Sequence, residues 1–356
     1  MQPMDILIMI LAATLILGFL VFIHEGGHFL VARAFGVRVT EFMLGLPGPN
    51  IGVTWKGTKF GITALPLGGY ANVCGMTAPT QSSEITEKVL VYVYAQGTVL
   101  LEDVQDAFGL SEEDAYNVLE DLAEWGSIKR PLKRDEYNVY RTPAMEGFEQ
   151  GQAHVNFDPD ALYETEERKQ YFSLPFWKRS LILLAGPVMN LLFALVVFLL
   201  IYSVLGVDVT NTVTGEVKHM TLGPLEAIQA GLNLIGMTAV AIVGLFNPAT
   251  AAETVSQSSS IIGIAVMSKT AVEAGFMTTL MFSAIISISL GLMNLLPIPP
   301  LDGGRFVVEI FQKISKKAVS VRVLNYLSFA GMALFIGLFI IMANQDIQRF
   351  IFGNWS

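Results

Sequence analysis

Long apolar runs without charge divide this chain into membrane and non-membrane parts. Four runs are of a length that suits a bilayer crossing: Ile6–Ile23, Ser180–Val207, Ala274–Leu301 and Val323–Gln345. A spanning helix needs about 20 residues, and the first run can continue past His24. We therefore predict an α-helical integral membrane protein with about four transmembrane helices, the first one retained and not cleaved as a signal peptide.

A fifth apolar run, 227–252, fits a crossing poorly. It contains three glycines and the polar residues Gln229 and Asn233. A single crossing here would also place the end of the third span on the opposite side from the end of the first. We predict that the segment 208–273 is a short outside loop followed by an interfacial or re-entrant helix.

Alternating apolar and polar positions follow the first span. Val53, Trp55, Phe60 and Ile62 flank a turn at 56–59, which predicts a β-hairpin within 51–65. Residues 1–80 therefore combine the first transmembrane helix with a membrane-associated β-hairpin.

Residues 81–142 have a different pattern. Three amphipathic helices are expected at 84–97, 101–110 and 111–126, the last capped by Ser111, and the stretch 127–141 reads as two strands around a charged turn. This order predicts an inserted α+β module that resembles a winged helix, followed by a linker at 143–179.

The charge distribution separates this module from nucleic-acid binders. Residues 81–142 hold 13 acidic and 6 basic residues, which is −7 of the chain's net −9. The expected recognition helix lies within 101–124, which has nine acidic residues and no basic one. Nucleic-acid recognition needs a positive surface, so we expect no nucleic-acid partner and instead a protein partner or a regulatory role.

The basic residues orient the membrane part. Of 22 Lys and Arg residues, 14 lie between Arg33 and Arg179 and four between Lys313 and Arg322. The positive-inside rule then predicts a multi-pass protein of the cell inner (plasma) membrane whose segments 33–179 and 302–322 are cytoplasmic and whose termini both lie outside.

The first span ends in a polar cluster, His24-Glu25-Gly26-Gly27-His28. This is the HExxH pattern, in which histidines one helical turn apart can bind one Zn²⁺ while the glutamate acts as general base on a metal-bound water. Ionisable groups in or beside lipid are costly, which favours a metal site over chance. We expect Gly26 and Gly27 to allow close packing of helices or backbone.

A catalytic zinc needs a third protein ligand. His154 and His219 are the only other histidines, and both are expected to be solvated. Asp302 follows a proline-rich stretch that ends the third span on the side where His24 lies. It is a candidate ligand, and the alternative is that it caps the helix that follows.

Three motifs in this order resemble the site-2 protease family of intramembrane zinc metalloproteases. They are HEGGH on the first span, AGPVMN at 185–190 on the second, and NLLPIPPLDGG at 294–304 in the segment 274–356 that holds the third and fourth spans. The resemblance implies that His24, His28 and Asp302 hold zinc and that Glu25 is the general base. It also implies that Asn294 assists substrate or oxyanion binding and that the hairpin re-enters the membrane and pairs with substrate.

The chain departs from bacterial relatives of this layout in two ways. About twenty polar residues follow the second span where one or two PDZ domains usually lie, and the module at 81–142 is unusual for the family. The resemblance implies a zinc-dependent endopeptidase that cleaves single-span proteins within the bilayer, near its cytoplasmic face. Regulated proteolysis of an anti-sigma factor and removal of signal-peptide remnants are both family roles.

Two other classes compete with this interpretation. A metal transporter would need ligands distributed across the bilayer, and the sequence offers one compact cluster. A non-catalytic scaffold that binds partners through its acidic module would have no use for Glu25.

Overall fold

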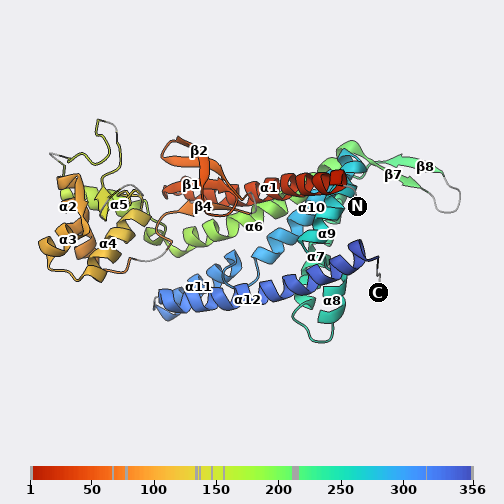
Figure 1. Ribbon diagram of the computed structural model, residues 1–356. Helices are drawn as coiled ribbons and strands as arrows, with labels where there is room; N and C mark the ends of the chain where they lie inside the picture. The colour runs from red at the N-terminus through yellow and green to blue at the C-terminus, as the bar shows by residue number, and fades with distance from the viewer. Residues whose placement is uncertain are drawn as a thin grey trace.

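The computed structural model describes residues 3–353 except for 66, 67, 77, 78, 133, 134, 136, 137, 146, 155, 156, 211–215 and 318. Figure 1 shows an elongated molecule with the helices α2–α5 at one end. Both termini lie toward the other end, where the hairpin of β7 (Val207–Thr210) and β8 (Val217–Met220) projects. Long apolar helices connect the two ends.

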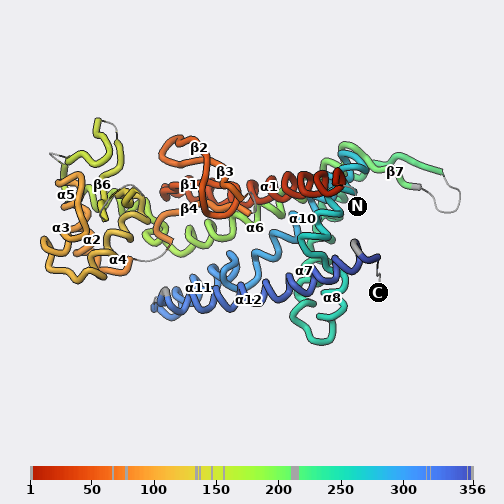
Figure 2. Tube along the Cα trace, in the orientation of Figure 1, coloured from red at the N-terminus to blue at the C-terminus, as the bar shows by residue number. Residues whose placement is uncertain are grey.

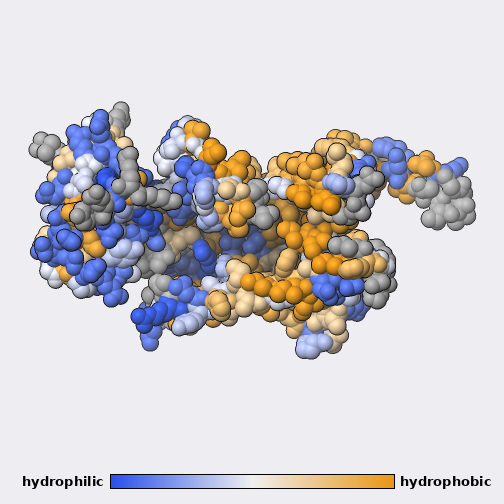
Figure 3. Space-filling model, in the orientation of Figure 1, coloured by the Kyte–Doolittle hydropathy of each residue, from blue (hydrophilic) through white to orange (hydrophobic). Residues whose placement is uncertain are grey.

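Five helices among the described residues are long and apolar enough to cross a membrane. They are α1 (Pro3–Ala34), α6 (Phe176–Leu199) with its continuation η2 (Leu200–Leu205), α7 (Pro224–Gly244), α10 (Phe276–Asn294) and α12 (Val321–Asp346), which ends in η3 (Ile347–Ile351). The apolar runs thus correctly predicted α1, α6, α10 and α12. Figure 3 shows the apolar surface over these helices and a hydrophilic surface over α2–α5.

Helix α7 differs from its prediction. We expected about four spanning helices, with this segment interfacial or re-entrant, but α7 meets the length and hydropathy of a fifth span. In Figure 1 it runs crosswise to α1 and α6. Its Gly231 packs against Leu195 and Phe198 of α6. An interfacial placement in the bilayer stays a prediction.

Helix α6 lies at the centre of the membrane part, packed between α1 and α10. The core between α6 and α10 includes Ala194, Phe198 and Ile288. Two shorter helices, α8 (Ala251–Gln257) and α9 (Ile261–Glu273), follow α7, and α9 packs against α1. Helix α9 was not expected from the sequence, because its 13 residues are too few to span a membrane.

A four-stranded sheet packs on the end of α1 that carries the histidines. Its strands are β1 (Val39–Leu44), β2 (Asn50–Trp55), β3 (Thr58–Thr63) and β4 (Gly69–Val73), in the order β2-β3-β1-β4. Phe22 and Phe29 of α1 contact Phe42 of β1 at ring-centroid distances of 5.5 and 5.6 Å. β4 also packs against α1.

The expected hairpin is formed by β2 and β3. The pairs Trp55↔Thr58 and Val53↔Phe60 set its register. Lys56 and Gly57 form a two-residue turn, and both have positive φ, 48° and 82°. Two positive φ values match the twist of paired strands, which explains the glycine at 57. Re-entry of this hairpin into the bilayer stays a prediction.

The chain between β4 and α6 forms the insert, which we define as residues 79–172. It contains α2 (Ser83–Gln96), β5 (Thr98–Leu100), α3 (Leu101–Phe108), α4 (Glu112–Glu124), β6 (Val139–Arg141), α5 (Pro159–Arg168) and the start of the turn η1 (Tyr171–Ser173). Ser111 caps α4 by accepting a hydrogen bond from the Asp114 N–H at 3.1 Å, as its sequence predicts. β6 pairs with β5, and part of the charged turn before β6 lies outside the described residues.

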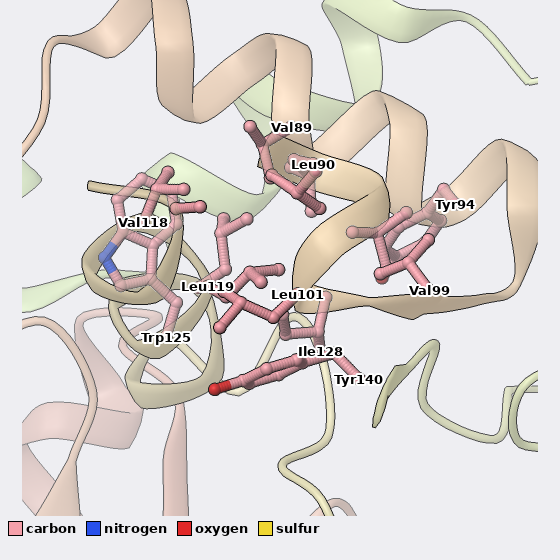
Figure 4. Packing of buried hydrophobic residues seen from close by; sticks show 14 residues of the cluster. Val89, Leu90, Tyr94, Val99, Leu101, Val118, Leu119, Trp125, Ile128 and Tyr140 are labelled. Carbon is pink, nitrogen blue, oxygen red and sulfur yellow. The ribbon is translucent and has the colours of Figure 1, made fainter. Parts of the chain in front are cut away.

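A separate hydrophobic core holds the insert together (Figure 4). Leu90, Leu119, Trp125 and Tyr140 are almost fully buried in it. Residues of the expected linker complete this core, namely Phe157, Leu162, Tyr163 and Phe172. The segment 157–172 is therefore packed against the three helices.

Candidate metal centre

His24 and His28 lie one turn apart on α1, which continues without a break to Ala34. Both side chains are buried, and their Nε2 atoms lie 3.3 Å from each other. Asp302 is the first residue of α11 (Asp302–Ser315), and its Oδ2 lies 3.1 Å from Nε2 of His24 and 3.3 Å from Nε2 of His28. The fold thus joins residues from opposite ends of the chain in one cluster.

The geometry of this cluster fits a zinc ion. A tetrahedral zinc with bonds of roughly 2.0–2.1 Å places its ligand atoms about 3.3 Å apart. The three donor atoms form a triangle of 3.1, 3.3 and 3.3 Å, which matches one face of that tetrahedron. Two imidazoles and a carboxylate are also a ligand set that zinc accepts, and they leave a fourth position for substrate chemistry.

Asp302 does not cap α11. Its helix shows no side-chain capping hydrogen bond, and Leu301 is the N-cap residue. Instead the carboxylate reaches the two histidines. The capping alternative is therefore wrong, and the position of Asp302 agrees with a ligand role.

Outer hydrogen bonds orient both imidazoles. Nδ1 of His28 lies 2.7 Å from the carbonyl oxygen of Ile182 on α6, which accepts the Nδ1 hydrogen. Nδ1 of His24 lies 3.1 Å from the side-chain amide of Asn190, also on α6. A proton on each Nδ1 leaves each Nε2 free to bind a metal.

Gly186 of α6 makes room for the metal ligands. A methyl group at this position would collide with Nε2 of His28 and lie 2.7 Å from Nε2 of His24. Gly27 serves helix packing, because a methyl there would lie 2.5 Å from the Ala185 carbonyl oxygen. Gly26, in contrast, has no neighbour within 4 Å. Close packing therefore explains Gly27 and not Gly26.

Glu25 faces the sheet. Its Oε2 accepts a hydrogen bond of 2.9 Å from the backbone N–H of Ala71 in β4. This bond holds the carboxylate at the free edge of β4, because β1 pairs with the other edge. A general base needs such a fixed position within reach of the reacting proton.

Helix α11 is fixed through Glu309. Its carboxylate accepts a hydrogen bond of 3.2 Å from the Tyr171 hydroxyl and forms an ion pair of 3.1 Å with Arg179 at the start of α6. Because Asp302 begins the same helix, these contacts help to fix the third donor relative to α6.

All five site residues predicted from the sequence line one cavity of about 630 Å³. They are His24, Glu25, His28, Asn294 and Asp302. Asn294 is the last residue of α10, and its Nδ2 donates to the carbonyl oxygen of Leu290 at 3.0 Å. The strand in the cavity wall is β4, represented by Gly69–Val73, and not the hairpin 51–65 that was expected to meet the substrate.

The other two histidines do not line this cavity. His219 is exposed on β8 and lies 2.8 Å from Asp208, as expected for a solvated residue. His154 is buried in the insert, where it stacks on Phe148 with ring centroids 4.1 Å apart. Its predicted exposure was wrong, because aromatic packing with Phe148 and Tyr94 covers the ring.

Three residues of α6 that shape the site were not predicted from the sequence: Ile182, Gly186 and Asn190. Asn190 and Gly186 lie within the AGPVMN stretch, which was noted only as part of a motif. Ile182 contributes a backbone carbonyl, which no side-chain pattern can reveal.

A sequence model of "Peptidase family M50" matches residues 12–338, nearly the whole chain and every residue of the metal centre. The chain belongs to this family. As a member of M50 it is a zinc metalloendopeptidase of the site-2 protease type, and its cofactor is Zn²⁺.

Relatives align over almost the full length. A Campylobacter jejuni protein assigned as a zinc metalloprotease is 29% identical over 96% of this chain and 94% of its own length. The zinc metalloprotease RasP of Geobacillus kaustophilus and the regulator of sigma-W protease RasP of Bacillus subtilis are each 24% identical over 96% of this chain and 98% of their own length.

The two kinds of relative differ in length. The alignment with the Geobacillus protein covers 429 residues, so that protein contains sequence without a counterpart in the 356 residues of this chain. The alignment with the Campylobacter protein covers 360 residues. The Campylobacter protein therefore aligns with this chain without a long additional segment of the kind that the Geobacillus protein contains.

Proposed function

We propose that this M50 peptidase cleaves single-span membrane proteins within the bilayer, using His24, His28 and Asp302 as zinc ligands and Glu25 as general base. The observation that carries the proposal is the triangle of donor atoms of 3.1–3.3 Å, with Glu25 and Asn294 in the same cavity. The match to M50 supplies the reaction class.

The reaction is hydrolysis of a peptide bond. Zinc, when bound, supplies Lewis-acid activation of water and of the scissile carbonyl. Glu25 takes a proton from the attacking water as its oxygen bonds to the carbonyl carbon. Glu25 then gives that proton to the amide nitrogen as the carbon–nitrogen bond breaks. Asn294, at the end of α10, is placed to offer a side-chain hydrogen bond to the substrate.

A substrate helix must unwind before its backbone can reach this site. Unpaired backbone groups are costly in lipid, so an extended substrate needs hydrogen-bonding partners. The edge of β4 that does not pair with β1 supplies them in this proposal. The Ala71 N–H on this edge is already bonded to Glu25, so other backbone groups of the edge would pair with the substrate. Strand addition at β4 would hold the scissile bond beside the general base.

The positions of the basic residues support a cytoplasmic site. Arg33, Lys178 and Arg179 lie at the ends of α1 and α6 that face the insert, while both termini lie toward the opposite end (Figure 1). We infer an inner-membrane protein with outside termini and a released cytoplasmic product. Anti-sigma factors and signal-peptide remnants are the substrate classes to test first.

The experiment compares wild type with Glu25→Gln and Asp302→Ala on tagged single-span proteins, and measures zinc content as well as cleavage. Glu25→Gln should keep zinc and lose cleavage by a factor of at least about 100, the scale of general-base catalysis. Asp302→Ala should lose both. His219→Ala is the control histidine, because it lies outside the cavity. Full cleavage by Glu25→Gln would contradict the mechanism.

A transporter is the weaker alternative. Among the described residues, His24, His28 and Asp302 form the one cluster of three or more His, Cys, Asp or Glu side chains with metal-binding spacing. A transport path would need further sites along the membrane normal, and the described residues provide none.

A further inference from the structure

The insert forms part of the wall of the catalytic cavity. Glu124, the last residue of α4, and Arg130 line the same cavity as His24 and Asp302. The insert is thus more than an appended module. A polypeptide that occupies the cavity can therefore contact these two side chains.

Polar contacts fix the insert to Arg38, the residue directly before β1. The Arg38 guanidinium donates to both carboxylate oxygens of Glu166 at 2.7 and 3.0 Å, and to the carbonyl oxygen of Trp125 at 3.1 Å. Trp125 directly follows Glu124. The Arg38 contact therefore fixes the backbone at the very point where the insert meets the cavity.

Gly126 brings the two parts into direct contact. Its φ is +71°, and a methyl group there would lie 2.9 Å from side-chain atoms of both Arg38 and Thr40. Glycine is needed for both reasons. The end of α4 therefore lies directly against β1, and Glu124 has a defined place at the cavity.

The charged side chains at and near this part of the cavity wall differ in whether they have a hydrogen-bond or ion-pair partner. Arg130 is bonded to Glu120 at 2.8 Å, and Asp121 accepts hydrogen bonds from the backbone and hydroxyl of Thr80. Glu124 is exposed, and within the described part of the chain its carboxylate makes no hydrogen bond or ion pair, although partial burial raises its pKa and the charge of Arg130 acts on it to lower its pKa. The remaining cation of the wall, Arg305, lies on α11 beside the metal ligands.

We propose that Glu124 binds a lysine or arginine in the cytoplasmic flank of the substrate, so that the insert selects which membrane proteins are cleaved. Single-span proteins carry an excess of Lys and Arg on the cytoplasmic side of their spans, which is the charge that Glu124 complements. The inference rests on the proposed function, because it requires the substrate to cross the cavity from the membrane side to the insert.

The kinetic test reverses the charge on the substrate flank and, separately, the charge at position 124 of the enzyme. One single-span substrate is made with Lys or with Glu at the same positions of its cytoplasmic flank, and each form is cut by wild type, Glu124→Lys and Glu113→Lys. Wild type should prefer the Lys form. Glu124→Lys should raise KM for the Lys form about tenfold with little change in kcat. For the same variant, the Glu form of the substrate should return KM to about the value that wild type has for the Lys form.

Glu113→Lys is the matched control. It makes the same charge change in the first turn of the same helix, outside the cavity wall, and should retain the wild-type preference. If Glu124→Lys slows both substrates equally, or if Glu113→Lys reverses the preference as well, the proposed contact is wrong.

A second test measures binding without turnover. In a Glu25→Gln background, Glu124→Cys should form a disulfide with a cysteine in the substrate flank, since the native Cys74 is buried. Glu113→Cys should not. Absence of the Glu124→Cys cross-link while wild type still cleaves that substrate would refute the flank contact and leave the peptidase assignment intact. Cleavage by Glu25→Gln would separately refute the role of Glu25 as general base.

Discussion

The side-chain amide of Asn190 lies 3.1 Å from Nδ1 of His24, and its Oδ1 is buried without a hydrogen-bond partner. A metal at Nε2 of His24 requires the proton on Nδ1, and that N–H needs an acceptor. Rotating the amide by 180° exchanges its oxygen and nitrogen, an assignment that hydrogen bonding decides. The rotated amide accepts from His24 and gives Oδ1 the partner it lacks.

Replacing Asn190 by leucine should therefore weaken zinc binding by about 10- to 100-fold, the usual effect of losing an outer partner of a metal-bound histidine. Competition with a chelator measures this affinity in the purified protein. Ser180→Ala on the same helix is the control, since its hydroxyl donates only to the Phe176 carbonyl. Unchanged zinc affinity in Asn190→Leu would mean that the amide does not orient His24.

Gly186→Ala should displace the metal ligands. The added methyl group would overlap Nε2 of His28, so zinc content should fall far below one per chain and cleavage with it. Gly26→Ala is the matched control, because that site has open space and alanine favours a helix over glycine by about 1 kcal/mol. Metal analysis and thermal unfolding of both variants distinguish a blocked site from a misfolded protein.

The ion pair between Arg38 and Glu166 should make insert docking sensitive to acid. Burial alone would raise the pKa of the Glu166 carboxyl, but Arg38, Lys169 and Ser127 outweigh it and hold this pKa below its ordinary value. A depressed pKa means that the stabilisation is complete above the unfolded pKa near 4.3 and is lost as the pH falls through the folded value.

Glu166→Gln measures this contribution. It should lower the free energy of unfolding at pH 7 by roughly 3 kcal/mol, the scale of breaking a buried pair. The difference from wild type should shrink as the pH falls below about 4. A difference that stays constant from pH 7 to pH 3 would show that charge is not its source.

Cys74 should resist alkylation in the folded protein. It is 1% exposed, and burial raises the pKa of its thiol to about 11. Because the thiolate is the reactive form, maleimide at pH 7.5 should label it much more slowly than it labels the unfolded chain. Mass spectrometry before and after denaturation tests this, and rapid labelling of the native protein would contradict the buried position.

Local sequence patterns correctly predicted individual helices, a helix cap and the pair of histidines on α1. The spacing of His24 and His28 follows from one turn of helix, and the Ser111 cap follows from three neighbouring residues. Asp302 required a motif 274 residues beyond His28, since no local pattern states which loop returns to α1. Tertiary contacts decided the features that were missed, including the burial of His154 and the edge that β4 presents to Glu25.

The connection of the insert to the sheet has a further consequence. The chain departs at Cys74 and Gly75 and returns at Tyr171 and Phe172, whose N–H groups donate to the Cys74 and Gly75 carbonyls at 2.9 and 3.1 Å. The segment at which the chain enters the insert and the segment at which it leaves therefore lie side by side. Because the chain resumes where it departed, the sheet and the membrane helices need no rearrangement to carry a whole additional module at this position.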